Sequence, residues 1–281
     1  MKLGYFGIGS GPCADPDAAV RVAGAAEDAG FESLWTGEHV VLPDPQVPPS
    51  PVPPDTAMLD PVVALAFVAA ATERVLLGTG IIIVPQRNPL VLAKQLASLD
   101  VLSGGRLLFG AGVGYLRPEF AALGVPFEEK GARTDEYLDA ILALWTEKKP
   151  AYEGRFVSFS GVDAHPRPAQ QPHPPLVIGG HSRGAFRRAV LRGNGWYGFF
   201  QDVDASARCL RQLEDAAAEI ERPESLGRLD ISITPPPGLD RDSAARYRDL
   251  GVDRLIPLCP ARSAEEVVDF VRRTADELAD L

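Results

Sequence analysis

The sequence predicts an α/β protein, a (β/α)8 TIM barrel with loop insertions. Short segments rich in β-branched and aromatic residues alternate with segments of helical periodicity along the chain. The strand segments are nearly continuous apolar runs, which is typical of parallel strands covered on both faces. Eight strand–helix pairs fit within 281 residues, and this count and length favour a closed barrel over a doubly wound open sheet.

The predicted strands are short and apolar. In chain order they are Leu3–Ile8, Ser33–Trp35, Val75–Val84, Leu107–Gly112, Leu176–Ile178, Trp196–Phe200, Leu229–Ile233 and Arg254–Leu258.

The predicted helices fill the intervals between these strands. The first begins after the capping residue Asp15, with Pro16 at its first position, and ends at Gly30. The last begins at Ser263-Ala-Glu-Glu266, which has the pattern of a capping box. The others are Pro61–Ala71, Pro89–Leu102, Asp135–Trp145, Gly184–Arg192, Ala205–Ile220 and Ser243–Leu250.

Three proline-rich segments interrupt this alternation at Pro43–Pro54, Pro166–Pro175 and Pro235–Pro237. The first is predicted to be a long extended loop, because it lacks apolar periodicity. Residues Tyr152–Phe159 are predicted to form part of a β-hairpin between the fourth barrel helix and the fifth strand. No segment has the features of a domain boundary, so we expect a single domain over residues 1–281.

Composition narrows the functional class. The net charge is −10, and acidic and basic residues are interspersed without a basic stripe, so we expect no nucleic acid partner. Three widely spaced cysteines predict neither a disulfide framework nor a zinc site. The N-terminus lacks the apolar region of a signal peptide, and the apolar stretch Val62–Ala71 is too short to span a bilayer. We therefore expect a cytoplasmic protein without a membrane partner.

Polar residues and glycines collect where the predicted strands end. In a (β/α)8 barrel these ends and the following loops form the active site, so the mouth of the barrel is the candidate site. The groups at successive strand ends are Gly7, Glu38-His39, Thr79-Gly80-Ile81, Gly112 with Gly114, and Gly179-Gly180-His181-Ser182.

His39 is the predicted catalytic residue. Histidine exchanges a proton near neutral pH more readily than other side chains, and the adjacent Glu38 could tune or orient it. The alternative is a polar pair in a solvated loop. We expect solvated roles for His165 and His173, because both lie in a proline-rich segment.

Two glycine-containing turns are predicted to contact a coenzyme. Glycines in Gly110–Gly114 would let the backbone approach a flat ring system, although a tight strand–helix turn explains them equally well. This run is not a dinucleotide-binding fingerprint, since it lacks the required helix start and spaced acidic residue. The loop Gly179–Ser182 precedes a helix, whose N-terminus suits a phosphate. A glycine turn with a serine cap is the alternative.

Other kinds of chemistry lack support. Four histidines without an H-x-H or H-E-x-x-H pattern predict no metal site. The G-x-S-x-G motif of acyl-transfer nucleophiles is also absent.

The sequence resembles the luciferase-like monooxygenase superfamily over almost its whole length. The most specific segment runs from Leu77-Gly-Thr-Gly80 through Pro85-Gln-Arg-Asn88-Pro and Asp100-Val-Leu-Ser-Gly-Gly105-Arg to Gly114. Pro174-Pro-Leu-Val-Ile-Gly-Gly180 and Gly193-Asn-Gly195-Trp196 agree with it. Within the superfamily, the chain is most similar to the branch of oxidoreductases that use the deazaflavin coenzyme F420.

This resemblance implies roles for the strand-end residues. Glu38 and His39 would lie beside the coenzyme ring, and a cis peptide at Gly80–Ile81 would back that ring. Gly179, Gly180, His181 and Ser182 would hold the coenzyme phosphate. The chain departs from the sugar-phosphate dehydrogenases of this branch, because it has Tyr115 and Pro118 where they carry an acid and an asparagine. Their substrate is therefore not expected here.

The expected function is hydride transfer to or from a small organic substrate, with coenzyme F420 as cofactor. An FMN-dependent luciferase-like monooxygenase is the first alternative. A non-catalytic barrel serving binding or assembly is the second, although intact polar strand ends count against it. A homodimer and the direction of hydride transfer are left open.

Overall fold

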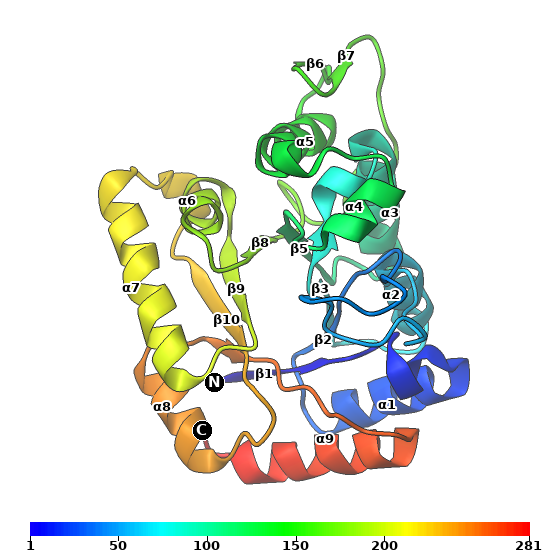
Figure 1. Cartoon of the computed structure of the whole chain (residues 1–281), viewed down its shortest axis with the longest axis vertical. Coiled ribbons are helices and arrows are strands. Elements are labelled where there is room, and N and C mark those ends of the chain that lie inside the picture. The colour runs from blue at the N-terminus through cyan, green and yellow to red at the C-terminus, as the bar shows by residue number, and fades with distance from the viewer.

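The computed structural model describes residues 1–281 and contains a closed barrel of eight parallel strands surrounded by helices (Figure 1). This confirms the predicted fold. The order of hydrogen-bonded strands is β3-β2-β1-β11-β10-β9-β8-β5-β4, and pairing of β3 with β5 closes the ring. The strands are β1 (Lys2–Phe6), β2 (Ser33–Thr36), β3 (Leu76–Thr79), β4 (Ile82–Ile83), β5 (Leu107–Gly112), β8 (Leu176–Gly179), β9 (Gly195–Phe199), β10 (Asp230–Thr234) and β11 (Arg254–Leu255).

The third barrel strand is split. The sequence predicts one strand over Val75–Val84, whereas the structure has β3 and β4 on either side of Gly80–Ile81. The peptide between these two residues is cis, as predicted. Both halves pair with β5, at Leu77–Leu107 for β3 and at Ile82–Ala111 for β4.

All eight predicted barrel helices are present, with ends that shift by a few residues. They are α1 (Pro16–Asp28), α2 (Pro61–Ala69), α3 (Pro89–Leu102), α5 (Lys130–Thr146), α6 (Arg183–Arg192), α7 (Val203–Glu219), α8 (Arg241–Asp249) and α9 (Ala264–Leu278). Asp15 caps α1 and Ser263 caps α9, as their sequences predict. A short helix, α4 (Arg117–Ala122), is not predicted.

Aromatic side chains fill the barrel interior. Trp35 stacks on Tyr197 with ring centroids 5.6 Å apart, and Leu108, Val177 and Ile256 complete this buried cluster. At the other end of the barrel, Arg254 forms ion pairs with Glu32 and Asp230 and also donates to Ser232. The interior is therefore a packed core, and the polar strand ends stand at its opposite rim.

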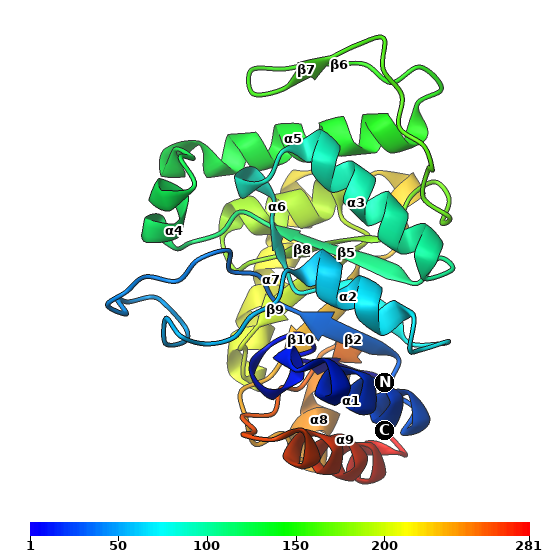
Figure 2. The same ribbon diagram turned by 90° about the vertical axis from the view of Figure 1, so that its right-hand side faces the viewer.

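The predicted hairpin is confirmed. Strands β6 (Tyr152–Glu153) and β7 (Ser158–Phe159) pair antiparallel and lie over the outer side of α5 (Figure 2). The carboxylate of Glu136 on α5 accepts hydrogen bonds from the backbone amides of Phe156 and Val157, at 2.5 and 2.8 Å. This insertion is thus fixed to a helix and not to the barrel strands.

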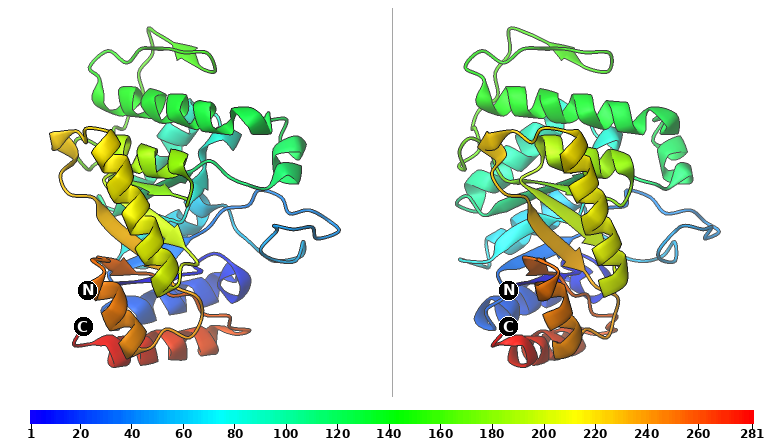
Figure 3. Two further views of the ribbon diagram at one scale, coloured as in Figure 1. Left: turned by 60° about the vertical axis from the view of Figure 1, so that its left-hand side comes forward. Right: turned by 90° about the vertical axis from the view of Figure 1, so that its left-hand side faces the viewer.

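Residues 40–59 form an arm without regular secondary structure. The arm projects from the same side of the molecule as α4 (Figures 2 and 3). Its ends are fixed, because Val40 N donates to Glu119 and Leu59 N donates to the carbonyl of Gly9 at 2.8 Å. No helix of the protein is both long and apolar enough to cross a membrane.

Candidate active site at the barrel mouth

His39 follows the end of β2, and its side chain is 7% exposed. Its two ring nitrogens have different partners. Nδ1 lies 3.0 Å from Oε2 of Glu119, and Nε2 lies 3.2 Å from the hydroxyl of Tyr115. A histidine held on both sides in this way has a fixed ring orientation, which general acid–base chemistry requires.

Glu119 is a functional candidate that the sequence analysis did not identify. It lies on α4, is 1% exposed, and also accepts a hydrogen bond from Val40 N at 2.6 Å. A buried carboxylate is costly unless its oxygens are paired, and here each oxygen has one partner. The only signal in the sequence is an acidic residue shortly after the strand-four glycines.

Tyr115 is the partner of His39 nearer to solvent. It is 47% exposed, and its ring meets the imidazole edge-on with centroids 5.7 Å apart. Desolvation, followed by the nearby charge of Glu119, raises the pKa of Tyr115 above its ordinary value. The phenol therefore keeps its proton at neutral pH and can donate to His39.

Glu38 does not contact His39 through its side chain. Its carboxylate instead accepts from Ile83 N at 2.5 Å and from Nε of Arg87 at 2.7 Å. Arg87 also reaches Asp60, with 2.6 Å between Nη2 and Oδ2. The prediction that Glu38 orients the histidine therefore has no support in this geometry. Glu38 therefore joins the segment after β2 to Ile83 of β4 and to Arg87.

Ile81 occupies the space that nearby glycines leave. A Cβ atom on Gly112 would lie 2.6 Å from the Ile81 side chain, and one on Gly179 would lie 2.7 Å from it. These glycines therefore make room for Ile81, which is itself partly exposed. Thr79 is fully buried, and its hydroxyl accepts from the Gly110 amide and donates to the Gly110 carbonyl, both at 2.8 Å.

The remaining predicted glycines lie in turns. A Cβ on Gly7 would lie 3.0 Å from the Tyr5 hydroxyl, and one on Gly114 would lie 2.6 Å from Ile83. Gly114 also packs against Phe120 of α4, in agreement with the alternative of a tight strand–helix turn.

The loop between β8 and α6 offers free backbone donors. The amides of residues 181–184 have no acceptor within the chain. Gly180 has φ +118°, a conformation that favours glycine, and its carbonyl accepts from the indole of Trp196 at 2.8 Å. Ser182 caps α6 by accepting from Ala185 N, so its hydroxyl serves the helix as the alternative interpretation expects. The exposed amides stand at the positive end of the helix.

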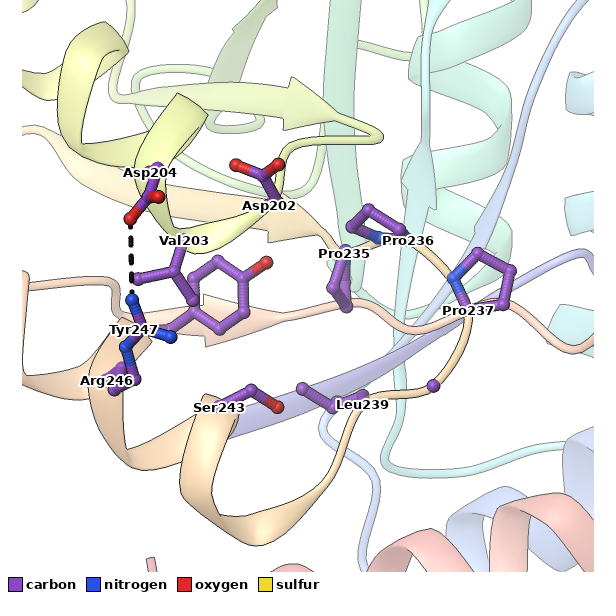
Figure 4. A pocket seen from close by; sticks show the side chains of 11 residues that line it. Asp202, Val203, Asp204, Pro235, Pro236, Pro237, Leu239, Ser243, Arg246 and Tyr247 are labelled. Atoms are coloured by element: carbon purple, nitrogen blue, oxygen red, sulfur yellow. Dashed lines mark hydrogen bonds and ion pairs between the residues drawn. The ribbon is translucent and has the colours of Figure 1, made fainter.

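A separate cavity lies between α7 and α8. This cavity of about 310 Å³ is lined by Asp202, Asp204, Pro235–Pro237, Arg246 and Tyr247, among others (Figure 4). Its polar side chains have partners within the chain: Asp204 pairs with Arg246 at 3.4 Å, and Tyr247 donates to the Gln201 carbonyl at 2.7 Å. None of the predicted site residues lines it.

Comparison with known proteins identifies the family. The profile of the luciferase-like monooxygenases matches residues 4–276. An uncharacterized protein of Mycobacterium tuberculosis is 34% identical over 275 residues, covering 94% of each chain. The chain belongs to the luciferase-like monooxygenase family. The FMNH2-dependent dimethylsulfone monooxygenase of Pseudomonas putida is 35% identical over 153 residues, which cover 53% of this chain and 41% of that protein.

Solved structures with the same fold include a monooxygenase and an F420-dependent dehydrogenase. The monooxygenase RslO1 from Streptomyces bottropensis has a TM-score of 0.80 and 25% identity, with 99% of both chains covered. An F420-dependent secondary alcohol dehydrogenase in complex with an F420–acetone adduct has a TM-score of 0.79 and 16% identity, covering 100% of this chain and 99% of that one. The oxygenating constituent of 3,6-diketocamphane monooxygenase from Pseudomonas putida, in complex with FMN, also shares the fold, with a TM-score of 0.66 and 18% identity over 83% of this chain and 67% of that one. The fold alone therefore does not separate F420 from FMN.

Proposed function

We propose that this protein is a coenzyme F420-dependent oxidoreductase that transfers hydride to or from a small organic substrate. The observation that carries the proposal is the buried His39 at the end of β2, bonded to a buried carboxylate on one side and to a half-exposed phenol on the other. A deazaflavin coenzyme supplies hydride transfer when it is bound. The protein must then bind it, orient the substrate and move one proton.

The residues at the mouth fit such a coenzyme. The free amides of residues 181–184 stand at the N-terminus of α6, and donors at a helix N-terminus would suit a phosphate. Gly180 is partly exposed at the start of this loop, whereas Gly179 is buried at the end of β8 and makes room for Ile81. The Gly80–Ile81 turn, with the partly exposed Ile81, provides an apolar wall for the ring. Thr79 is not included in this proposal, because its hydroxyl is fully used within the barrel.

In this proposal His39 carries the proton that accompanies hydride transfer. Its burial excludes bulk water from the imidazole, and its two bonds fix the ring. Either alcohol oxidation or reduction of an activated double bond requires such a group.

An FMN-dependent monooxygenase is the second candidate. The relative that uses FMNH2 favours it, and the same amides at α6 would suit the phosphate of FMN. A non-catalytic barrel is disfavoured, because its mouth holds a buried histidine bonded to a carboxylate and a phenol, an arrangement suited to general acid–base chemistry.

Fluorescence titration of the purified protein distinguishes the two coenzymes. We expect micromolar binding of F420 and no measurable binding of FMN. In a variant, Gly180→Val, we expect weaker coenzyme binding, because it introduces a side chain at the phosphate loop. Backbone strain at φ +118° should also lower the melting temperature, so binding is compared at a temperature where circular dichroism shows both proteins folded. Protein that purifies yellow with tightly held FMN would overturn the F420 assignment.

The role of His39 is tested by His39→Ala. Turnover of a substrate found by screening small alcohols and activated alkenes should fall by roughly 10²–10⁴-fold, with coenzyme affinity changed only modestly. Unchanged turnover would show that His39 only lines the site. An equal loss of coenzyme affinity and turnover would show that its role is structural.

A further inference from the structure

The two ring nitrogens of His39 lie in different environments. The Nδ1 side meets Glu119, whose side chain is fully buried. The Nε2 side meets Tyr115, which is 47% exposed. Among the three linked groups, the tyrosine is therefore the one that a molecule at the barrel mouth can reach directly.

The backbone amide of Val40 determines which carboxylate oxygen of Glu119 is free to accept from His39. Val40 N–H points at Oε1, and an amide hydrogen can only be donated. Oε2 of the carboxylate then accepts the hydrogen on Nδ1, which gives the neutral imidazole its Nδ1–H form. Nε2 consequently carries the lone pair, and the hydroxyl of Tyr115 is its donor.

We propose that Glu119, His39 and Tyr115 form a proton relay in which Glu119 fixes the Nδ1–H form of His39 and Tyr115 passes the proton between Nε2 and the substrate. Tyr115 is then a catalytic residue that touches the substrate, whereas Glu119 is a positioning residue. The role of Tyr115 rests on the proposed function, but the role of Glu119 does not.

The proton movements balance in both directions. When a substrate hydroxyl is deprotonated, its O–H bond breaks and a new O–H bond forms on Tyr115. The hydrogen that Tyr115 held moves to Nε2, and the resulting imidazolium lies beside the Glu119 carboxylate. In the opposite direction Tyr115 protonates the substrate and is refilled from Nε2–H. The raised pKa of Tyr115 keeps its hydroxyl protonated between turnovers.

Nitrogen-15 NMR of the coenzyme-free protein tests the first part. Long-range coupling patterns distinguish the two neutral forms of imidazole, and His39→Gln assigns the signal among the four histidines. We expect the Nδ1–H form in the parent protein. In Glu119→Gln the side-chain oxygen must face Val40 N–H, so the amide NH2 faces Nδ1 and the ring should switch to the Nε2–H form.

Glu128→Gln is the matched control, because Glu128 is exposed in the turn that follows α4. This variant should leave the Nδ1–H form of His39 unchanged. An Nε2–H form in the parent, or no change in Glu119→Gln while the fold is intact by circular dichroism, would overturn the positioning role.

Turnover of Tyr115→Phe tests the second part. We expect a loss of about tenfold or more, with KM nearly unchanged and coenzyme affinity preserved, because only a proton carrier is removed. Tyr152→Phe in the remote hairpin should have no effect. If His39→Ala loses turnover and Tyr115→Phe does not, the relay fails and the proposed function stands. If no coenzyme binds to the parent protein, the proposed function fails, and Tyr115 loses its role with it.

Discussion

Burial controls the reactivity of individual side chains in this barrel, and Cys13 shows this most clearly. Desolvation raises the pKa of its thiol to about 11, so only about 10⁻³ of it is thiolate at pH 8. We expect Cys13 to resist Ellman's reagent in the native protein and to react after unfolding. Cys259 is partly exposed and should react first.

Two serine variants separate these thiols. Cys13→Ser should leave the native reaction amplitude unchanged, whereas Cys259→Ser should reduce it. A clear loss of native amplitude in Cys13→Ser would show that the site around Cys13 opens to solvent.

The sequence predicts Glu38 as the carboxylate beside His39, whereas the structure places Glu119 there. Adjacent residues in an extended segment point to opposite sides, so Glu38 and His39 are directed to different partners. Glu119 lies 80 positions further along the chain, and only the closed barrel brings it to His39. No local pattern could have indicated that contact.

At the scale of an element, Asp60 joins the start of α2 to the barrel. Its carboxylate accepts from the amides of Val62 and Val63 at 2.9 and 3.0 Å and pairs with Arg87. We expect Asp60→Ala to lower the free energy of unfolding by about 1–2 kcal/mol at pH 7, measured by urea denaturation. Asp60→Asn keeps a capping oxygen and should cost less.

The stability that Asp60 contributes should depend on pH. Burial alone would raise its pKa, but Arg87 and the two amides hold it below the ordinary value. For a carboxyl with a lowered pKa, the stabilisation is present above the unfolded pKa of about 3.9 and is lost as the pH falls through the folded value. The difference in stability between the parent and Asp60→Asn should therefore shrink below about pH 4. A difference that stays constant would exclude the ionised pair with Arg87.

Helices with strong apolar periodicity or a clear capping residue can be predicted from the sequence, whereas a short helix without a cap cannot. The range of α3, Pro89–Leu102, was predicted without error, because Asn88 and Pro89 mark its start. Helix α4 has only six residues and no side-chain cap, so it lacks both signals. The break in Val75–Val84 was also invisible to apolar periodicity, since both halves are equally apolar. Its position came from the family resemblance.

For the whole molecule, the barrel closes where the split third strand meets β5. β3 pairs with β5 at Leu77–Leu107 and Gly78–Leu108, and β4 pairs with it at Ile82–Ala111 and Ile83–Gly112. Between these two parts the Thr79 hydroxyl bonds to the backbone of Gly110. A Cβ on Gly110 would lie 1.7 Å from the Thr79 carbonyl oxygen, a distance that no small adjustment relieves. We expect Gly110→Ala to be largely unfolded or insoluble, as measured by circular dichroism and thermal melting.

Gly131→Ala is the control for this variant. Gly131 lies in α5 with open space around it, so alanine should raise the stability by about 0.5–1 kcal/mol. If Gly110→Ala melts close to the parent protein, β3 and β5 are less closely packed than described.

One carboxylate links the arm to the imidazole. Oε1 of Glu119 holds Val40, where the arm begins, and Oε2 holds His39. The two oxygens belong to one rigid planar group, so a rotation that follows Val40 misaligns the bond to Nδ1. The start of the arm and the imidazole ring are therefore held by the same side chain, and replacing Glu119 would release both at once.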